Sequence, residues 1–284
     1  MLDDLERSLT VAGTIGEALA AKRRGAAILA GGTWLMRYPR RGISMPRALV
    51  SLHRLDGFKT IDIQADTVTI GAAVTHEALG RALRGIAVLE AVATAASNSA
   101  NPAIRRVATV GGNLCTPDFA AADLLPALLA VDAIVELRAD HAPMRLPLAC
   151  FLTNRQELLA DAILTGVLVP RSMIASVHMR LPLRRAGDYP VAIVSCALSS
   201  KGRINVAVGS VEDVARRWTT LEAAFSREPG GCPANAQIAA TLAEECNDFV
   251  GRDGIEADGW YRRQVLPALV RRGMEALLHK EAAR

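Results

Sequence analysis

Ala26-Ala27-Ile28-Leu29-Ala30-Gly31-Gly32-Thr33 is the stretch that decides the fold, an apolar, strand-like run that ends in a pair of glycines. A second pair occurs much later, in Thr109-Val110-Gly111-Gly112-Asn113. Paired glycines permit positive φ angles and a close approach of backbone to ligand, and successive N–H groups in such a turn form a concave nest for phosphate oxygens. One pair alone is typical of an ordinary turn. Two pairs in strand-like contexts predict a grip on both halves of a pyrophosphate, and therefore a dinucleotide.

Composition narrows the class of protein. The 284 residues, of which 51% are hydrophobic, are enough for a sizeable core and for two modest domains. No stretch approaches the roughly eighteen uninterrupted apolar residues that a membrane span needs, and the mixed charges of residues 1–7 do not match a secretory signal. We therefore expect a cytoplasmic protein. The net charge of +4 is small and its arginines are spread along the chain, which argues against a nucleic-acid-binding face.

The cysteines and histidines form no metal-binding pattern. The cysteines lie far apart with no Cys-x-x-Cys pair, and their odd number fits reduced thiols better than a disulfide framework. The histidines have no metal-ligand spacing, and we expect them to be incidental. If electrons pass through this chain, an organic cofactor is expected to carry them. The residues concerned are Cys115, Cys150, Cys196, Cys232, Cys246, His53, His76, His141, His178 and His279.

Hydrophobic periodicity and turn residues predict strands and helices in both halves of the chain. The strands expected in the first half are residues 26–30, 48–52, 58–63, 68–71 and 134–137. The helices are residues 16–24, 86–97 and 120–129, and a helix that is capped by Thr75 and runs through Leu83. The second half is expected to hold strands at 176–181, 191–198 and 204–208, followed by helices at 234–250 and 261–279. Because strands and helices are segregated, the prediction is an α+β fold in both halves.

Five segments carry a resemblance to a known family. They are residues 30–33, 69–75, 104–113 with its continuation through Pro117 and residues 122–124, 184–189, and 257–263. Their content and spacing resemble those of the FAD-binding medium subunit of the molybdenum hydroxylases, the xanthine dehydrogenase and aerobic carbon monoxide dehydrogenase type. The resemblance runs nearly end to end. It implies an FAD-binding domain of the vanillyl-alcohol-oxidase (PCMH) type, made of two subdomains, over residues 1–171. A smaller α+β domain with a three-stranded antiparallel sheet would follow over residues 172–284.

The resemblance also implies which residues hold FAD. The pyrophosphate would lie against two loops, with backbone N–H groups and threonine hydroxyls as donors, and the flavin ring near the domain junction. The two loops are Ala30, Gly31, Gly32, Thr33, Trp34 and Leu35, and Thr109, Val110, Gly111, Gly112 and Asn113. Further contacts are implied for Asp123, Leu164, Arg180, Asp188 and Tyr189.

Several of these positions have a simpler explanation beside the functional one. Asn113 fits a contact to phosphate or to the ribityl chain, or a cap of its own turn. Asp123 would accept hydrogen bonds from the FAD ribose, but a carboxylate is also common at the start of a helix. Leu164 would lie against the cofactor or belong to a core strand. Arg180 would bind the nucleotide or be an exposed strand charge. Tyr189 would cover the flavin or pack in the core.

Two residues depart from the family pattern. Trp34 replaces the usual Asp or Asn after the first glycine pair, and Arg106 replaces the common Asn before the second. Neither change removes a backbone donor. Trp34 would pack on a partner subunit or on adenine, and the sequence does not decide between them. The chain also lacks the inserted four-cysteine segment that some relatives carry for an extra iron–sulfur cluster.

The function implied is that of an electron-transfer flavoprotein subunit with no catalytic residue of its own for the substrate. A molybdopterin-binding large subunit would oxidise the substrate, and a small subunit with 2Fe-2S clusters would pass electrons to this FAD. The assembly would be a heterotrimer or a dimer of heterotrimers. The substrate is not readable from this chain. If Tyr189 covers the face on which a nicotinamide would stack, NAD is a less natural final acceptor than a quinone, a cytochrome or oxygen. The alternatives are a self-contained flavin oxidoreductase of the same superfamily and a scaffold subunit that has lost FAD.

Overall fold

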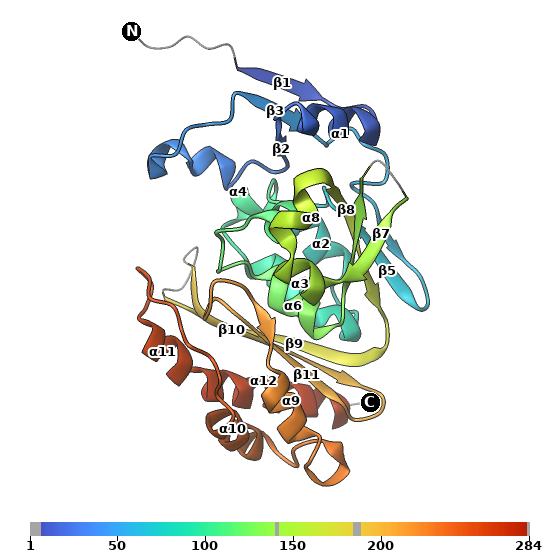
Figure 1. The fold of residues 1–284 in the computed structure, drawn as a ribbon. Helices are drawn as coiled ribbons and strands as arrows, with labels where there is room; N and C mark the ends of the chain where they lie inside the picture. Colours follow the sequence, from blue (N-terminus) through green and yellow to red (C-terminus); the bar gives the residue numbers. More distant parts are fainter. Residues whose placement is uncertain (1–6, 140–141, 184–188, 283–284) are drawn as a thin grey trace.

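Three β-sheets follow one another from the N-terminal to the C-terminal end of the molecule (Figure 1). The computed structural model describes residues 7–139, 142–183 and 189–282. The first sheet is parallel and small, whereas the second and third are antiparallel. Helices pack between and beside the sheets, so that the α+β prediction is confirmed.

The first sheet carries the first glycine pair. Its strand order is β1-β3-β2, with β1 Ser8–Val11, β2 Ala27–Leu29 and β3 Ala48–Ser51. Helix α1 (Ile15–Arg23) connects β1 to β2 and begins at Thr14, whose side chain accepts a hydrogen bond from the Glu17 N–H. The chain leaves β2 directly into Gly31-Gly32 and then forms the 3₁₀ turns η1 (Leu35–Arg37) and η2 (Pro39–Arg41).

The second sheet has five strands in the order β4-β5-β8-β6-β7. These are β4 Ile61–Ile63, β5 Thr67–Gly71, β6 Ile134–Arg138, β7 Met144–Pro147 and β8 Ile163–Pro170. Its helical elements are α2 His76–Ala82, η3 Ala87–Leu89, α3 Glu90–Asn98, α4 Pro102–Arg105, α5 Val110–Cys115, α6 Leu124–Ala130, α7 Leu148–Thr153 and α8 Arg155–Asp161. Every residue of α6 is buried, which places this helix at the centre of the molecule.

The third sheet has the order β12-β11-β10-β9. Its strands are β9 Met173–Pro182, β10 Pro190–Ser199, β11 Ile204–Gly209 and β12 Arg216–Arg217. The helical elements that follow are α9 Thr219–Phe225, η4 Pro229–Gly231, α10 Ala236–Glu245, α11 Gly259–Gln264 and α12 Leu266–Ala282. Strand β10 is contacted by both α6 and α12, which explains why almost all of its residues are buried.

The structure corrects the predicted elements in several places. The expected three-stranded sheet has a short fourth strand, β12. The expected helix over 261–279 is two helices, α11 and α12, because Pro267 lacks an N–H and suits the first turn of a new helix. Strand β8, the central strand of the second sheet, was not among the predicted strands. Its apolar run is interrupted by Gly166, where a Cβ would lie 2.9 Å from the carbonyl oxygen of Ile70.

The buried hydrophobic residues form two clusters. One extends from Ala12 to Met173 and includes a few residues of the third sheet, and the other runs from Ala175 to Leu277. Along the sequence, the boundary between the two clusters therefore falls at the start of β9. Among the helices of the described residues, none has the length and apolar character that crossing a membrane requires.

Candidate functional site

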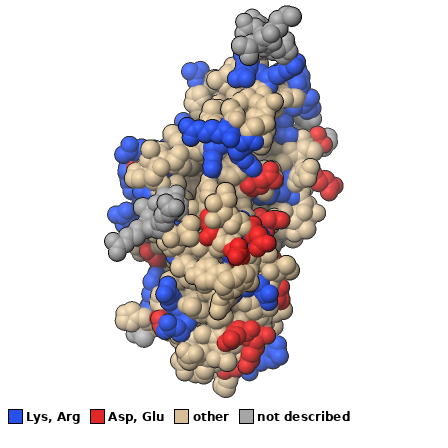
Figure 2. All heavy atoms as spheres, turned by 90° about the vertical axis from the view of Figure 1, so that its left-hand side faces the viewer, with Lys and Arg blue, Asp and Glu red and all other residues tan. Residues whose placement is uncertain are grey.

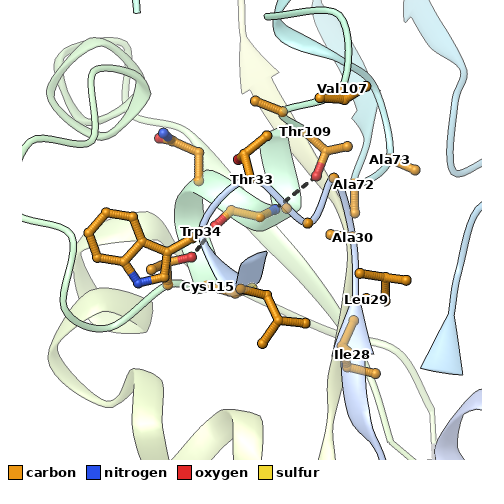
Figure 3. Close-up of a pocket in the computed structure, with 18 of the residues that line it drawn as sticks. Ile28, Leu29, Ala30, Thr33, Trp34, Ala72, Ala73, Val107, Thr109 and Cys115 are labelled. Atoms are coloured by element: carbon orange, nitrogen blue, oxygen red, sulfur yellow. Dashed lines mark hydrogen bonds between the residues drawn. The ribbon is translucent and has the colours of Figure 1, made fainter. Parts of the chain in front are cut away.

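A cavity of about 890 Å³ lies where the three parts of the chain meet. This volume is within the range of small-molecule and cofactor sites. Its walls include the first glycine segment and the start of α5 (Figure 3). Tyr189, at the entry to β10, also lines it. Of the residues predicted to bind the cofactor, those that line the cavity are Ala30, Gly31, Gly32, Thr33, Trp34, Leu35, Thr109, Gly111, Gly112, Asn113, Asp123, Leu164 and Tyr189.

The first glycine segment contains one residue in the left-handed region and borders the cavity. Gly32 has a φ of 70°, which is the left-handed region that glycine adopts readily. Gly31 is required for another reason, since a Cβ there would lie 1.9 Å from the Val107 carbonyl oxygen. Within the described part of the chain, the four successive N–H groups from Gly31 to Trp34 have no hydrogen-bond acceptor. Free consecutive N–H donors at a cavity wall suit a phosphate group.

The second glycine segment is not a turn but the first part of helix α5. Neither Gly111 nor Gly112 has a positive φ, so this part of the prediction is wrong. Both N–H groups already have acceptors in the chain, Gly111 with the Ala72 carbonyl at 2.8 Å and Gly112 with Thr109 Oγ1 at 3.1 Å. A Cβ on Gly111 would lie 2.9 Å from the Ala72 oxygen. The second pair therefore permits close packing of α5, rather than supplying free donors.

The hydroxyl groups of two threonines in the cavity wall are further hydrogen-bond donors. Thr109 Oγ1 accepts from the Gly112 N–H as the cap of α5, which leaves its hydroxyl hydrogen available to another group. Thr33 and Thr109 both line the cavity (Figure 3). Val110, by contrast, is fully buried and donates its N–H to the Val74 carbonyl. Val110, predicted to bind the cofactor, does not line the cavity and instead packs α5 against the rest of the chain.

Basic side chains also line the cavity. Figure 2, which looks onto the left-hand side of Figure 1, shows Lys and Arg gathered in the upper part of this face above a zone of acidic residues. A positive surround favours the binding of an anion such as a pyrophosphate. The basic residues that line the cavity are Lys22, Arg37, Arg40, Lys59 and Arg106.

Hydrogen-bond acceptors also line the cavity. The described residues include two buried side-chain atoms in this wall that have no partner, His76 Nε2 and Asn113 Oδ1. Ser99 Oγ donates to the Ala96 carbonyl at 3.2 Å and lies 2.7 Å from His76 Nδ1. Because Ser99 donates to Ala96, we assign the ring hydrogen to Nδ1, which leaves Nε2 as an acceptor. Burial lowers the pKa of His76 to about 4, although Asp123 acts in the opposite direction, and the ring is neutral near pH 7.

Asp123 and Arg180, predicted separately from the sequence, form an ion pair. Arg180 Nε lies 2.8 Å from Asp123 Oδ1, and the Asp123 carboxylate is almost fully buried. His178 Nε2 lies 3.8 Å from the same oxygen, and its Nδ1 lies 2.9 Å from Ser195 Oγ. Asp123 lines the cavity whereas Arg180 does not, so Arg180 is placed behind the carboxylate. Leu164, which is buried, lines the cavity from β8.

Three aromatic rings, which we call the aromatic rim, lie together in the cavity wall. The ring centroids of Trp34 and Phe119 are 4.7 Å apart, and those of Phe119 and Tyr189 are 5.6 Å apart. The Arg37 guanidinium lies over both Trp34 and Tyr189, at 5.0 and 5.4 Å, and Arg41 lies 4.9 Å from the Trp34 ring. Trp34 thus packs within its own chain. Asp188, also predicted, lies outside the described residues.

Sequence reasoning missed Phe119 and His76. Phe119 is followed by three alanines, and no local pattern marks it as a partner of Trp34 and Tyr189. His76 does carry a signal, because it follows Thr75 directly. Thr75 caps α2 by accepting from the Ala78 N–H, and the His76 N–H donates to the Ala108 carbonyl beside Thr109. The segment 69–75 and the segment 104–113 meet at this hydrogen bond, and His76 therefore lies in the cavity wall.

Known proteins resemble this chain both in sequence and in fold. Residues 5–172 match the family model described as the FAD binding domain in molybdopterin dehydrogenase. The 6-hydroxypseudooxynicotine dehydrogenase complex subunit alpha of Paenarthrobacter nicotinovorans is 28% identical over 90% of this chain and 88% of its own length. The xanthine dehydrogenase FAD-binding subunit of Escherichia coli O157:H7 is 30% identical over 67% of this chain and 66% of its own.

Solved structures show the same fold. A chain of the carbon monoxide dehydrogenase from Hydrogenophaga pseudoflava that lacks the Mo-pyranopterin moiety superposes with a TM-score of 0.83, covering 96% of this chain and 98% of that one at 23% identity. A chain of quinoline 2-oxidoreductase from Pseudomonas putida 86 gives a TM-score of 0.82 at 22% identity, covering 96% and 97% of the two chains.

Proposed function

The chain belongs to the family of FAD-binding domains of molybdopterin dehydrogenases, and we propose that it is the FAD-binding electron-transfer subunit of a molybdenum hydroxylase complex. The observation that carries the proposal is the row of free N–H groups from Gly31 to Trp34 in the wall of a large cavity. Relatives named as a dehydrogenase complex subunit and as a xanthine dehydrogenase FAD-binding subunit support it.

The chemical character of the cavity fits FAD. This cofactor has a pyrophosphate that needs donors and positive charge, and sugar and ribityl hydroxyls that need acceptors. The nest from Gly31 to Trp34 and the hydroxyls of Thr33 and Thr109 would hold the pyrophosphate. His76 Nε2, Asn113 Oδ1 and the Asp123 carboxylate would accept from hydroxyl groups. Gly111 and Gly112 would contribute by allowing α5 to approach, since their N–H groups are already bonded.

The aromatic rim and Leu164 would form the apolar surroundings of the flavin ring. Tyr189 would cover one face of that ring, with Arg180 and Asp188 as further cofactor contacts. When bound, FAD supplies the capacity to collect single electrons and deliver them in pairs. The protein residues bind and orient the cofactor, and none of them is assigned to substrate oxidation.

The remainder of the complex is proposed on the same basis. A molybdopterin-binding large subunit would oxidise the substrate, and a small subunit with 2Fe-2S clusters would deliver the electrons to FAD, which passes them to an external acceptor. We propose a heterotrimer that can pair into a dimer of heterotrimers. Within this chain, residues 1–171 would form the two-subdomain FAD domain of the vanillyl-alcohol-oxidase type and residues 172–284 a second domain. The two hydrophobic clusters, which divide near Met173, support this boundary.

The test is a visible absorption spectrum of the purified chain, before and after titration with FAD. We expect a flavin spectrum and saturable binding of one FAD per chain. A colourless protein that fails to take up added FAD would favour the scaffold alternative. Substrate turnover by this chain alone, with no partner subunit, would instead favour a self-contained flavin oxidoreductase.

A further inference from the structure

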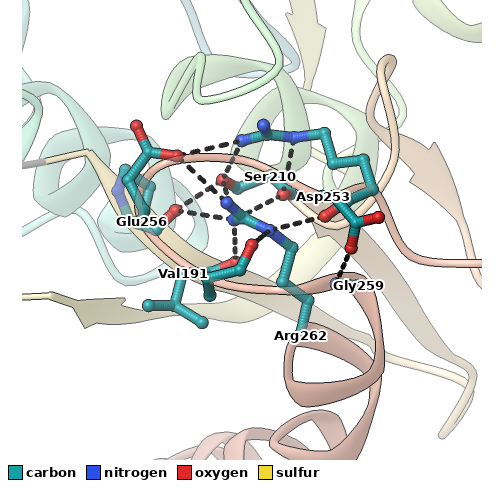
Figure 4. A network of polar contacts seen from close by, with 9 residues as sticks. Val191, Ser210, Asp253, Glu256, Gly259 and Arg262 are labelled. Atoms are coloured by element: carbon teal, nitrogen blue, oxygen red, sulfur yellow. Dashed lines mark hydrogen bonds and ion pairs between the residues drawn. The ribbon is translucent and has the colours of Figure 1, made fainter.

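A buried arginine lies behind the cavity wall, in the third part of the molecule. The side chain of Arg262, on α11, has no exposed surface. Its guanidinium donates to the carbonyl oxygens of Val191 at 2.6 Å, Ser210 at 3.0 Å and Arg252 at 3.0 Å, and pairs with Glu256 Oε2 at 3.0 Å (Figure 4). A buried charge is tolerated only when it is fully bonded, so these backbone segments are fixed around it.

Ser210 is the second member of this network. Its φ of 65° is uncommon for a residue with a side chain and persists only where its surroundings determine it. The Ser210 N–H donates to the Ala120 carbonyl at 3.1 Å, and Ser210 Oγ donates to the Pro190 carbonyl at 2.5 Å. The Ser210 carbonyl accepts from both Arg262 and Arg252.

The two backbone groups that Ser210 holds are next to two rings of the aromatic rim. Ala120 follows Phe119 directly, and Pro190 follows Tyr189 directly. The two ring centroids are 5.6 Å apart, although the residues come from the second and third parts of the chain. The shared contact of their neighbours with Ser210 connects these segments, and Arg262 fixes Ser210 and the first residues of β10.

We infer that Arg262 and Ser210 are positioning residues of the cofactor site, which set Phe119 and Tyr189 relative to each other in the cavity wall. They act through Ala120 and Pro190 and do not line the cavity themselves. Part of this inference, the effect on bound flavin, rests on the proposed function. The effect on the position of Tyr189 does not.

Two substitutions separate the parts of this network. Ser210→Gly keeps the N–H bond to Ala120 and the carbonyl bond to Arg262 and tolerates the positive φ. It removes the hydroxyl, which donates to the Pro190 carbonyl and accepts from Arg252 at 3.3 Å and Arg262 at 3.4 Å. Arg262→Lys keeps the charge but replaces the planar set of donors with a point charge. The matched control is Arg271→Lys, since Arg271 makes an exposed ion pair with Glu275 at 2.8 Å on α12.

The first readout does not involve FAD. The chain has three tyrosines, so ¹⁹F NMR of fluorotyrosine-labelled protein gives few resonances, and Tyr189→Phe identifies the one from Tyr189. We expect Ser210→Gly to shift or broaden the Tyr189 resonance and to leave that of Tyr38 unchanged. Arg262→Lys should do the same, with an added change at its neighbour Tyr261. An unchanged Tyr189 resonance in folded Ser210→Gly protein overturns the inference, whatever the protein does with FAD.

The second readout is a double-mutant cycle on FAD binding, with Arg262→Lys and Tyr189→Leu in the full chain. We expect Arg262→Lys to raise the Kd for FAD at least about threefold and to change the fluorescence of bound flavin, but to do neither in the Tyr189→Leu background. Equal effects in both backgrounds would mean that Arg262 acts on stability alone. If the wild-type chain binds no FAD, the proposed function fails and the NMR result still decides the positioning role.

Discussion

Gly31 packs so closely against the carbonyl oxygen of Val107 that no side chain fits at position 31. A Cβ on Gly31 would lie 1.9 Å from that oxygen. The contact joins the segment that leaves the first sheet to the segment that leads into α5. The two glycine segments are thus in contact through their backbones, and the shape of the cavity depends on this contact.

We predict that Gly31→Ala abolishes FAD binding or raises the Kd at least about tenfold, because the added methyl group must push the two segments apart. Titration of the purified variant with FAD measures this. Gly16→Ala is the matched control, since a Cβ there would have its nearest neighbour 3.9 Å away. FAD affinity in Gly31→Ala equal to that of the control would contradict the proposed role of the first glycine segment.

The Asp123–Arg180 pair leads to a second prediction. Asp123→Asn removes a buried carboxylate that Arg180 contacts at 2.8 Å and leaves that arginine facing a neutral amide. We expect a loss of about 2 kcal/mol in stability and a rise of about tenfold or more in the Kd for FAD. Urea unfolding and FAD titration give the two values. Glu275→Gln, which breaks an exposed pair of the same length, should change neither, and an equal effect in both variants would argue against a site role for Asp123.

The neutral state of His76 predicts a pH dependence of stability. Burial lowers its pKa from 6.5 to about 4 in the folded chain, so the unfolded chain binds a proton first as the pH falls. The contribution of His76 is therefore complete above pH 6.5 and is lost between pH 6.5 and 4, by about 3 kcal/mol in all. Urea unfolding across this range should show a smaller pH dependence in His76→Gln than in the wild type. The exposed His279→Gln serves as control, and identical pH profiles for His76→Gln and wild type would refute the prediction.

Tyr189 leads to a prediction about the electron acceptor. If its ring covers one face of the flavin, the reduced wild-type protein should be reoxidised by a quinone faster than by NAD. Tyr189→Ala should raise the rate with NAD at least about tenfold, while Tyr189→Phe, which keeps the ring, should behave like the wild type. Stopped-flow absorbance of the flavin measures these rates. Faster reoxidation of the wild type by NAD than by a quinone would exclude the proposed cover.

Local patterns predicted much of the fold. Strands β2, β3, β5, β6 and β9 to β11 and helices α2 and α3 follow from apolar periodicity, and the cap at Thr75 was expected from residue type. Strand β8 and helix α5 were not predicted, and both contain glycines that serve packing. The sequence shows a glycine but not the carbonyl oxygen that its missing Cβ leaves room for, so Gly111 and Gly166 were interpreted without their partners.

In the candidate site, too, local features could be predicted from the sequence and contacts between distant residues could not. The free donors of the first glycine segment are a local property and were predictable. The ion pair of Asp123 with Arg180 and the contact of Phe119 with Tyr189 join residues from different parts of the chain. Such pairs depend on how β9 and β10 pack against α6, and no spacing in the sequence encodes that packing. The Arg262 network is beyond prediction for the same reason, because its acceptors are backbone carbonyls of three separate segments.

The burial of α6 has a consequence for synthesis of the chain. This helix is complete once residue 130 has been made, yet it is covered in part by β10, β11 and β12, which come much later. While the ribosome adds those residues, a nascent chain that has already formed the second sheet presents an apolar Leu- and Ala-rich helix to the solvent. Such a surface attracts chaperones and other nascent chains. Truncation before β10 should therefore yield an aggregating fragment rather than a separable flavin module.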